Sequence, residues 1–413
     1  YKKKTSIVSL LPNGAAQSQK FQTETAVENL EYSFSSAIYK LQEEKQKKIA
    51  VLTGNGELLD LQLYSFLSEV SKKHKLAKFT LDSVENNSLK SLQDFQQFNL
   101  AIIAKPTESF TEEEKLVLDQ YIMNGGKTLW MFENVQADTD SLYKDGKMLA
   151  YPRDLNLTDF FFSYGLRVNA TLIQDLYAAK IPLATGNIGN KPQFQNLNWF
   201  YHPLVSGNPN HAISKNIAPV RLRFANQIDT LQNSLKKTVL LMSSMLTRKT
   251  GTPAIIELES IAIEPKEEEY SSGFQIFSLL VEGEFTSMYK NRIKPFNINN
   301  FSTKSTQNKM IVIADGDIVR NQIQKGKPFD LAKDKWTGEQ FGNKEFLLNA
   351  IDYLLDDNGL IELRNKTLKI NLLDKNKVYQ ERTLWQFINI VLPLLLLITF
   401  GIGFRYFRKK RYR

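Results

Sequence analysis

Two short segments of this chain combine residue types that bind ligands at the edge of an α/β sheet. Thr53-Gly54-Asn55-Gly56-Glu57 joins an apolar stretch to a helical pattern, and the segment 105–107 follows another apolar stretch. Backbone amides at the start of a helix in such a fold favour anions. We expect a ligand such as a glycan, a peptide or a lipid headgroup, and the candidate contacts are Gly54, Asn55, Gly56, Glu57, Lys105 and Thr107.

The glycine loop is not specific for nucleotides. It lacks the third glycine of the dinucleotide fingerprint and the Lys-Ser/Thr pair of a P-loop. A tight turn that needs the φ freedom of glycine explains Gly54 and Gly56 equally well. Both interpretations of the loop, ligand contact and simple turn, stay open.

Asp315 and Asp317 form a second candidate site, in the segment Ala-Asp-Gly-Asp after a buried apolar stretch. Two carboxylates at the carboxyl edge of a sheet can hold a hard cation or act as an acid and base pair. They can also cap a helix or pair with Arg320, and we favour this structural interpretation. Asp315 and Asp317 are therefore weak metal candidates, and we expect no metal site.

The sequence carries no pattern of a hydrolase triad or of a thiol enzyme. It has no cysteine, and its three histidines, His74, His202 and His211, lie in no G-x-S-x-G context. Packing, or a solvated charge, is the default role of each histidine. We therefore expect no catalytic residue, no enzyme activity and no cofactor. A degenerate hydrolase centred on Asp315 and Asp317 stays as an alternative.

These candidate residues lie on a pattern of alternating strands and helices. Thr111 and Glu114 form a capping box that begins one of the helices. Apolar periodicity predicts strands at 47–54, 78–84, 99–106, 127–133 and 310–319, and helices at 57–75, 111–123 and 343–357. The alternation predicts an α/β fold with a doubly wound, mostly parallel sheet and helices on both faces.

The segment 1–46 precedes this sheet. The opening YKKKTSIVSLLP predicts a strand, and a helix follows from Thr23 or Thr25. An apolar stripe on that helix is expected to dock on a core, and its members are Val27, Leu30, Phe34, Ile38 and Leu41. Since residue 1 is Tyr and not Met, we expect an export signal or an earlier transmembrane helix ahead of it.

Composition divides the rest of the chain into further segments. The α/β layer begins at 47–133, and an insertion at 134–305 interrupts it, first rich in Asn, Pro and Gly and then β-rich. The late strand and helix at 306–358 are expected to return to the first sheet. A polar stalk at 359–383 follows. We expect the insertion to present a variable interaction surface.

The C-terminus has the pattern of a membrane anchor. Residues 384–404 contain no charged residue and span about 31 Å as a helix, enough to cross a bilayer. Pro393 is expected to bend this helix slightly. The tail is basic, so by the positive-inside rule it is cytoplasmic and the body lies on the other side. The anchor residues are Trp385, Pro393, Phe404, Arg405, Tyr406, Arg408, Lys409, Lys410, Arg411 and Arg413.

The same tail explains the basic charge of the chain. The formal net charge is +9, and six of the positive charges lie in 405–413, which leaves about +3 for the rest. The excess charge therefore lies beside the predicted membrane span and not on a groove-facing patch. We expect inner-membrane lipid, and no nucleic acid, as a partner.

Several long strings resemble one known family. They are LAIIAKPTESFTEEEKLVLDQYIMNGGKTLWMFENVQADTDSLY, YPRDLNLTDFFFSYGLRVN, IPLATGNIGNKPQFQNLNWFYHPLV, VRLRFANQIDTL and RTLWQFINIVLPLLLLITFGIGF. In length and order they resemble the GldG family of gliding-motility-associated auxiliary proteins of Bacteroidota, over 1–413. The resemblance implies a glutamine-amidotransferase-like, flavodoxin-like or intraflagellar-transport-like α/β layer. It carries no amidotransferase activity, because the nucleophilic cysteine of those enzymes is absent.

The resemblance also implies a function. The family is similar to auxiliary, substrate-binding-like components of ABC-type transporters, grouped with a GldF-like permease and a GldA-like ATPase. It implies a periplasmic body anchored in the bacterial inner membrane that binds the permease, and a substrate as well, without its own catalysis. A homodimer within the complex is left open, and a periplasmic ligand-binding module is the alternative.

Overall fold

The computed structural model describes residues 5, 7, 8, 10, 19–42, 47–189, 191–366 and 375–412. The chain forms two compact units, Tyr1–Lys366 and Thr367–Arg413. We call the first unit the body. The opening strand predicted at 1–12 lies largely outside the described residues.

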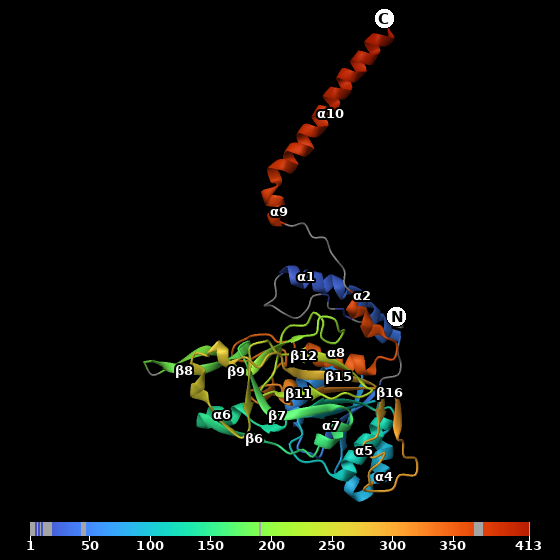
Figure 1. Ribbon diagram of the computed structural model, residues 1–413, viewed down its shortest axis with the longest axis vertical. Helices are drawn as coiled ribbons and strands as arrows, with labels where there is room; N and C mark the ends of the chain where they lie inside the picture. Colours follow the sequence, from blue (N-terminus) through green and yellow to red (C-terminus); the bar gives the residue numbers. More distant parts are fainter. Residues whose placement is uncertain are drawn as a thin grey trace. The chain divides into compact units, whose positions relative to one another are not determined.

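The body is built on a mixed sheet of ten strands (Figure 1). The strand order is β10-β9-β12-β15-β16-β4-β3-β1-β2, and β8 pairs with β9 outside this path. The strands are β1 (Lys48–Thr53), β2 (Lys75–Thr80), β3 (Leu100–Ala104), β4 (Lys127–Met131), β8 (Ala178–Ile188), β9 (Lys191–Gly207), β10 (Val220–Arg221), β12 (Lys236–Met242), β15 (Ile276–Thr286) and β16 (Lys304–Ile313).

The prediction of parallel pairing is confirmed for one half of this sheet. β2, β1, β3, β4 and β16 pair in parallel, so the late strand does return to the first sheet beside β4. The other half is antiparallel, from β16 through β15, β12 and β9 to β10. The sheet is therefore mixed, because the strands of the insertion add in antiparallel pairs at the β16 edge.

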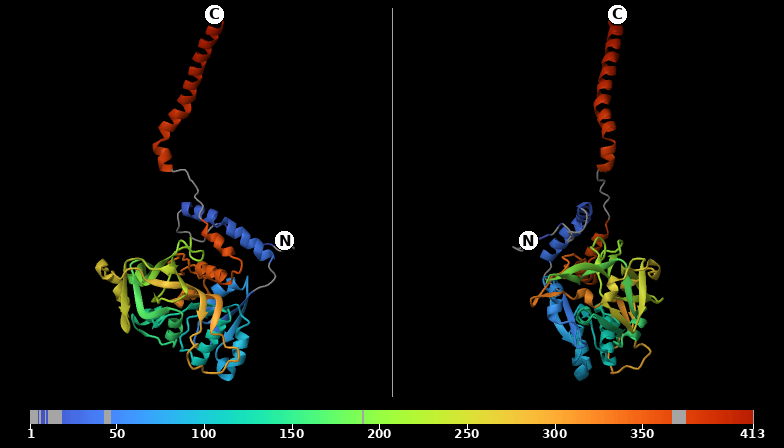
Figure 2. Two further views of the ribbon diagram at one scale, coloured as in Figure 1. Left: turned by 45° about the vertical axis from the view of Figure 1, so that its right-hand side comes forward. Right: turned by 90° about the vertical axis from the view of Figure 1, so that its left-hand side faces the viewer.

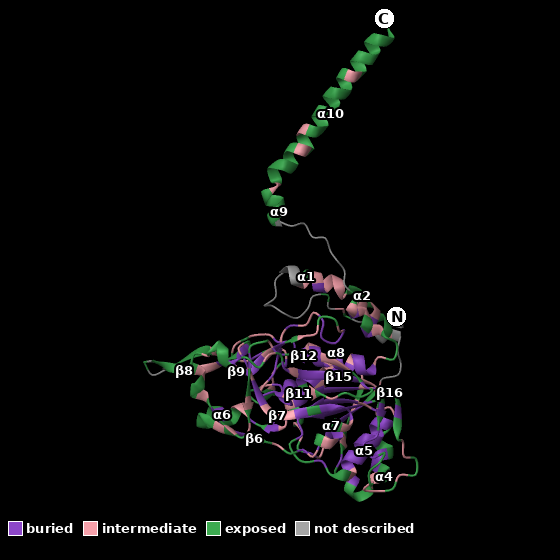
Figure 3. Ribbon diagram, in the orientation of Figure 1, coloured by how far each residue is buried: buried purple, intermediate pink, exposed green. Residues whose placement is uncertain are grey.

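Helices cover both faces of the parallel half. The helices are α3 (Asp60–Val70), α4 (Ser83–Phe95), α5 (Glu112–Met123) and α8 (Asn343–Leu355). Phe66 of α3 and Phe346 of α8 share one buried cluster, and Phe95 of α4 and Tyr121 of α5 share another. All five residues of β3 are buried, as the sequence of a doubly covered strand requires. Figure 3 shows this buried interior.

The capping box predicted at Thr111 is confirmed. Its side chain accepts a hydrogen bond from the Glu114 amide at 3.2 Å, and the Glu114 carboxylate accepts one from the Thr111 amide at 2.8 Å. α5 begins there because two amides at the helix start gain partners.

Residues 134–303 carry smaller elements as well as strands of the large sheet. Two three-stranded sheets have the orders β11-β7-β13 and β14-β6-β5. Their elements are β5 (Val135–Gln136), α6 (Thr139–Asp145), β6 (Lys147–Pro152), α7 (Thr158–Ser163), β7 (Leu166–Asp175), β11 (Asn226–Thr230), β13 (Thr247–Gly251), β14 (Ala254–Glu257), and the 3-10 helices η1 (Leu258–Ala262) and η2 (Glu267–Glu269). Trp199 and Phe224 belong to the buried cluster beneath them.

The body ends later than the sequence suggests. η3 (Asp317–Val319), β17 (Ile323–Gln324) and β18 (Lys327–Pro328) precede α8, and η4 (Leu360–Asn365) follows it. The sequence predicts a stalk over 359–383, but within it Ile361 and Arg364 are buried in the body. The Arg364 guanidinium donates to Asn349 of α8 at 3.3 Å.

Two helices precede the sheet, α1 (Gln19–Glu28) and α2 (Leu30–Gln42). The prediction that their apolar stripe docks on a core is wrong for its central members. Leu30, Phe34 and Ile38 are 42%, 47% and 54% exposed. The opposite face of α2 packs on the body instead, through Tyr32, which lies against Arg364 of η4. Figure 2 shows α1 and α2 in blue beside the orange-red end of the body.

The second unit contains α9 (Lys375–Gln380) and α10 (Arg382–Arg411). α10 has 30 residues, includes Pro393, and within the described residues is the one helix long and apolar enough to cross a membrane. None of its residues is buried. The predicted anchor residues from Trp385 to Arg411 all lie in α10, and Arg413 lies outside the described residues. The basic residues occupy its last turn, where cations suit the helix dipole.

Candidate functional site

A buried cluster of charges lies where three parallel strands end. Lys105 follows β3, Glu133 follows β4, and Asp317 follows β16. These strands are neighbours in the order β16-β4-β3, so their carboxyl ends meet at one edge of the sheet. Lys105 Nζ lies 2.5 Å from Asp317 Oδ2 and 3.2 Å from Glu133 Oε1. Arg153 Nη1 lies 3.2 Å from the same Glu133 oxygen.

Asp315 is a further carboxylate of this cluster and the most deeply buried of its acidic side chains. It is fully buried, and its carboxylate accepts hydrogen bonds from the amides of Arg223 at 2.8 Å and Asp317 at 2.7 Å. Burial raises the pKa of Asp315, and the nearby carboxylates Asp317 and Glu133 raise it further. Asp315 is thus the carboxyl of the cluster that holds a proton most readily.

Asp317 behaves in the opposite way. Burial alone would raise the pKa of Asp317, but Lys105, Arg223 and Arg320 together hold it below its usual value. Burial alone would lower the pKa of Lys105, but Asp317 and Glu133 hold it above its usual value. Lys105 and Asp317 therefore form a buried pair in which both groups are charged.

Gly316 lets these groups approach one another. Its amide donates to Glu133 Oε2 at 2.6 Å, and a Cβ atom at this position would lie 2.6 Å from that oxygen and from the Lys105 side chain. Lys105 itself has a left-handed φ of 56°, which L-residues adopt at a cost of about 1–2 kcal/mol. The strained backbone of Lys105 and the missing side chain of Gly316 thus allow Lys105 and Glu133 to lie close to Gly316.

The loop Gly54–Glu57, which we predicted to bind a ligand, lies beside the segment 105–107, and the two loops form hydrogen bonds with each other. The carbonyl of Asn55 accepts from the amide of Thr107 at 2.8 Å, and the Thr107 hydroxyl donates to the carbonyl of Gly56 at 3.0 Å. The side chain of Glu57 accepts from the Asn55 amide. A Cβ on Gly56 would lie 2.1 Å from the Thr107 hydroxyl oxygen, so this glycine is needed for close approach. Ligand contact at this loop stays a prediction.

The candidate residues thus separate into two places. Gly54, Asn55, Gly56, Glu57 and Thr107 lie in the loop contact, with Gly54 at a φ of 119°. Lys105 instead joins Asp315 and Asp317. The expected pairing with Arg320 is present but long, at 3.5 Å to Asp317, and Lys105 is the shorter partner. In the described part of the chain, no group of three or more acidic or histidine side chains is placed to hold a metal ion.

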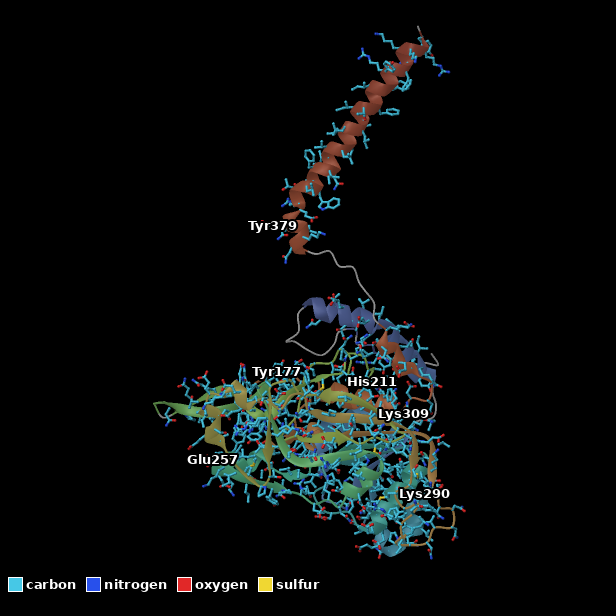
Figure 4. All side chains as sticks on the ribbon, viewed as in Figure 1. Tyr177, His211, Glu257, Lys290, Lys309 and Tyr379 are labelled. Carbon is cyan, nitrogen blue, oxygen red and sulfur yellow. The ribbon has the colours of Figure 1, made fainter. Side chains whose placement is uncertain are left out.

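His202 and His211 both lie in packed surroundings, and His202 Nε2 lies 3.4 Å from the Thr139 hydroxyl. His202 lies in β9, is buried, and has a pKa well below its usual value because of burial and of Arg223 and Arg221. The His211 ring lies 5.0 Å from the ring of Tyr353, and Lys309 Nζ lies 4.1 Å from that same ring. Figure 4 labels His211 and Lys309.

Sequence reasoning missed several residues of the cluster and its surroundings. Glu133 ends the predicted strand 127–133, and aligning the carboxyl ends of the predicted parallel strands would have placed it beside Lys105 and Asp317. Arg153, Arg221 and Arg223 carry no such signal, since they come from loops and short strands of the insertion.

A polar cavity of about 210 Å³ opens beside Asp317. It is bounded by α6, the start of β8, β9, the Arg221–Arg223 segment, and the loops after η3 and β18. Asp317 belongs to both the buried cluster and the cavity wall. The arrangement offers charged and polar groups to a small ligand, and on its wall the Thr139 hydroxyl lies 3.4 Å from His202 Nε2.

A family model described as an ABC-type uncharacterized transport system matches residues 46–350, which is more than half of the chain. The chain belongs to this family of ABC transporter auxiliary proteins. The match spans the large sheet from β1 to most of α8, including the charge cluster and the cavity. No curated protein matches the chain.

Solved structures also resemble parts of this chain. The mmIFT52 N-terminal domain is 13% identical, covers 75% of this chain and 99% of its own, and gives a TM-score of 0.41. A ThuA-like protein from Parabacteroides merdae ATCC 43184 is 12% identical, with coverages of 73% and 99% and a TM-score of 0.33. PurLQS from Thermotoga maritima is 10% identical, with coverages of 75% and 100% and a TM-score of 0.28.

Proposed function

We propose that this protein is a membrane-anchored, non-catalytic subunit of an ABC-type transporter, of the GldG kind associated with gliding motility in Bacteroidota. The body lies in the periplasm and the basic tail in the cytoplasm. The subunit binds a GldF-like permease in the inner membrane and through it a GldA-like ATPase. Family membership supports the transporter association.

The observation that carries the anchoring is α10. Its central residues are apolar, its described side chains are exposed or partly exposed, and its last turn is basic. An exposed apolar helix of this length is unstable in water and stable in a bilayer. The anionic cytoplasmic leaflet attracts the basic turn, which supports the proposed orientation.

The exposed stripe of α2 supports a contact between the body and a partner protein. Leu30, Phe34 and Ile38 lie on one face of the helix, at the spacing of a helix that docks in a groove. α2 packs on η4, and Glu31 pairs with Lys366 at 2.6 Å, the residue at which the body ends. We assign the permease as the occupant, since α2 itself packs on η4, the segment after which the chain continues to its membrane helix.

The absence of cysteine allows a clean test of the orientation. Lys290→Cys places one thiol on an exposed position of the body, and Arg411→Cys places one in the basic turn. In cells with a permeabilised outer membrane, an impermeant maleimide should label K290C, and should label R411C only after the inner membrane is opened. Labelling of R411C in intact spheroplasts would overturn the orientation.

The partner is tested by co-purification of the full chain from detergent-solubilised membranes. We expect a permease and an ATPase subunit to co-purify, and deletion of 384–413 to abolish this. Recovery of the chain without any transporter subunit would overturn the proposed function. Full recovery of the permease by the deletion variant would show that α10 is not the main contact.

A further inference from the structure

The cavity beside Asp317 is lined by five basic side chains, Lys180, Arg221, Arg223, Arg320 and Lys335, and by four carboxylates, Asp138, Asp140, Asp317 and Asp334. Its carboxylates already have cationic partners: Asp317 pairs with Lys105, and Asp334 accepts from Arg221 at 2.6 Å. Asp138 and Asp140 pair with Arg320 at 3.5 and 3.4 Å. Each of these four carboxylates therefore already has a basic partner.

Arg223 is the arginine of this wall that acts on Asp317 through its charge, without a hydrogen bond. Among the described residues, its guanidinium forms no ion pair and no hydrogen bond, although its backbone amide binds Asp315. It lines the cavity, and it precedes Phe224, which has a left-handed φ of 50°. The chain thus turns sharply after Arg223, where a bulky residue adopts an unusual backbone conformation.

A second arginine lies close to Arg223. Arg221 is two positions earlier in the chain, lines the same cavity and is buried. Asp334 pairs with Arg221 and not with Arg223, so one carboxylate lies in hydrogen-bond contact with this pair of guanidinium groups. Two cations in a partly desolvated wall repel each other unless an anion enters between or beside them.

Arg320 has hydrogen-bonding capacity to spare. It reaches its three carboxylates at 3.4–3.5 Å. Charge-assisted N–H···O bonds are usually about 2.7–2.9 Å long, so these are loose contacts. A planar guanidinium with loose partners can donate two parallel bonds to an incoming carboxylate or phosphate.

The volume of the cavity and the side chains at its rim limit the size and the chemical type of a ligand that it can bind. Its volume of about 210 Å³ is below the about 300–1,000 Å³ that is typical of sites for drug-sized ligands. Trp336 and Tyr143 at the rim are 65% and 42% exposed, so a small organic skeleton has apolar surface to lie against. A large polymer cannot enter, but a small acid can.

We propose that this cavity binds a small organic oxyanion, a carboxylate or a phosphate ester, through the guanidinium groups of Arg223 and Arg320. The site lies outside the carboxyl end of β16, the edge where open α/β sheets bind ligands. It is separate from the loop at Gly54–Glu57 and does not depend on which membrane protein binds α10. A subunit with such a site responds to a small acid as well as to its protein partners.

The test is isothermal titration of the full chain in detergent, with Arg223→Gln as the variant and Arg248→Gln as the matched control. Arg248 is an exposed arginine on β13 that pairs with Glu269, away from the cavity wall. The probes are glucuronate and citrate as carboxylates, glycerol 3-phosphate and glucose 6-phosphate as phosphate esters, inorganic phosphate, and glucose as the uncharged control.

We expect at least one organic anion to bind with a Kd below about 1 mM, and R223Q to weaken it by roughly 10- to 100-fold, as for loss of a charge-assisted hydrogen bond. R248Q should bind as the unmodified chain does. Comparing the two probe classes decides between a carboxylate and a phosphate ester. The thermal unfolding midpoint of R223Q without ligand should change little, since the Arg223 guanidinium forms no hydrogen bond or ion pair among the described residues and acts on Asp317 only through its charge. Equal binding by R223Q, or no binding by any anion below about 10 mM, would overturn the proposal.

Discussion

Lys105 and Asp317 are 212 positions apart in the chain, yet Lys105 Nζ lies 2.5 Å from Asp317 Oδ2. Both side chains are less than a tenth exposed. The pair joins the end of β3 to the end of β16, across β4. Because water cannot solvate either charge well, each depends on the other for compensation.

Replacing one member of this pair should be severely destabilising. Lys105→Met leaves Asp317 buried without its closest cation, which costs about 3–5 kcal/mol of the free energy of unfolding. Urea unfolding of the full chain, followed by tryptophan fluorescence, measures the loss. The control is Lys78→Met, which removes a solvated pair with Asp60 at 2.8 Å and should cost about 0–1 kcal/mol. A loss for K105M as small as that for K78M would contradict the role of the buried pair.

The protonation of Asp315 predicts a particular dependence of stability on pH. Burial, Asp317 and Glu133 raise the pKa of Asp315 to about 8, so the folded chain keeps a proton there that the unfolded chain has lost. Its contribution to stability is complete below pH 4 and is lost as the pH rises through about 8. The slope is at most about 1.4 kcal/mol per pH unit.

Asp315→Asn removes this titration. Its free energy of unfolding should therefore rise, relative to that of the unmodified chain, between pH 5 and pH 8. Urea unfolding at pH 5 and pH 8 measures how the free energy of unfolding of each protein changes with pH. A loss of stability from the altered hydrogen bonds is the same at both pH values, so it does not affect this comparison. Parallel slopes for the two proteins would show that Asp315 is ionised throughout this range.

Gly316 should not tolerate a side chain. Gly316→Ala places a Cβ 2.6 Å from Glu133 Oε2 and from the Lys105 side chain, so the cluster must shift. The backbone φ of −79° suits alanine, so the effect is one of space and should cost about 1–3 kcal/mol. Gly251→Ala is the control, because no heavy atom lies within 4 Å of its Cβ position. Thermal unfolding of both variants measures the difference, and equal midpoints would contradict the packing argument.

The sequence predicts the parallel half of the fold well, because its signals are local. The apolar runs around β1, β3, β4 and β16 and the Thr111–Glu114 box each lie within a few residues, and each element formed. The antiparallel half was less accessible. The sequence predicts that the later insertion is β-rich, but not the order in which β9, β12 and β15 pair, because these strands pair over long sequence separations.

The charge cluster could be predicted only in part for the same reason. Asp315 and Asp317 were recognisable as a pair, but their main partner Lys105 comes from a strand 212 positions earlier, and Glu133 from a third. The stripe on α2 shows a different limit. Its periodicity correctly indicates an amphipathic helix, but periodicity does not say whether the apolar face is covered by the same chain or by another one.

A charge on the exposed apolar stripe of α2 should weaken binding of the permease. Phe34→Asp places a charge at the centre of the exposed stripe between Leu30 and Ile38. The body should unfold at the same temperature as before, since Phe34 is 47% exposed and the stripe faces away from the core. Co-purification of the permease should fall, because a carboxylate in an apolar protein contact loses its hydration without gaining a partner. The control is Phe194→Asp on β9, where an aromatic ring that is 63% exposed lies on a different element. If F34D and F194D retain the permease equally, the stripe is not its binding surface; if F34D alone releases it while α10 is intact, the body and the membrane helix both contribute to the contact.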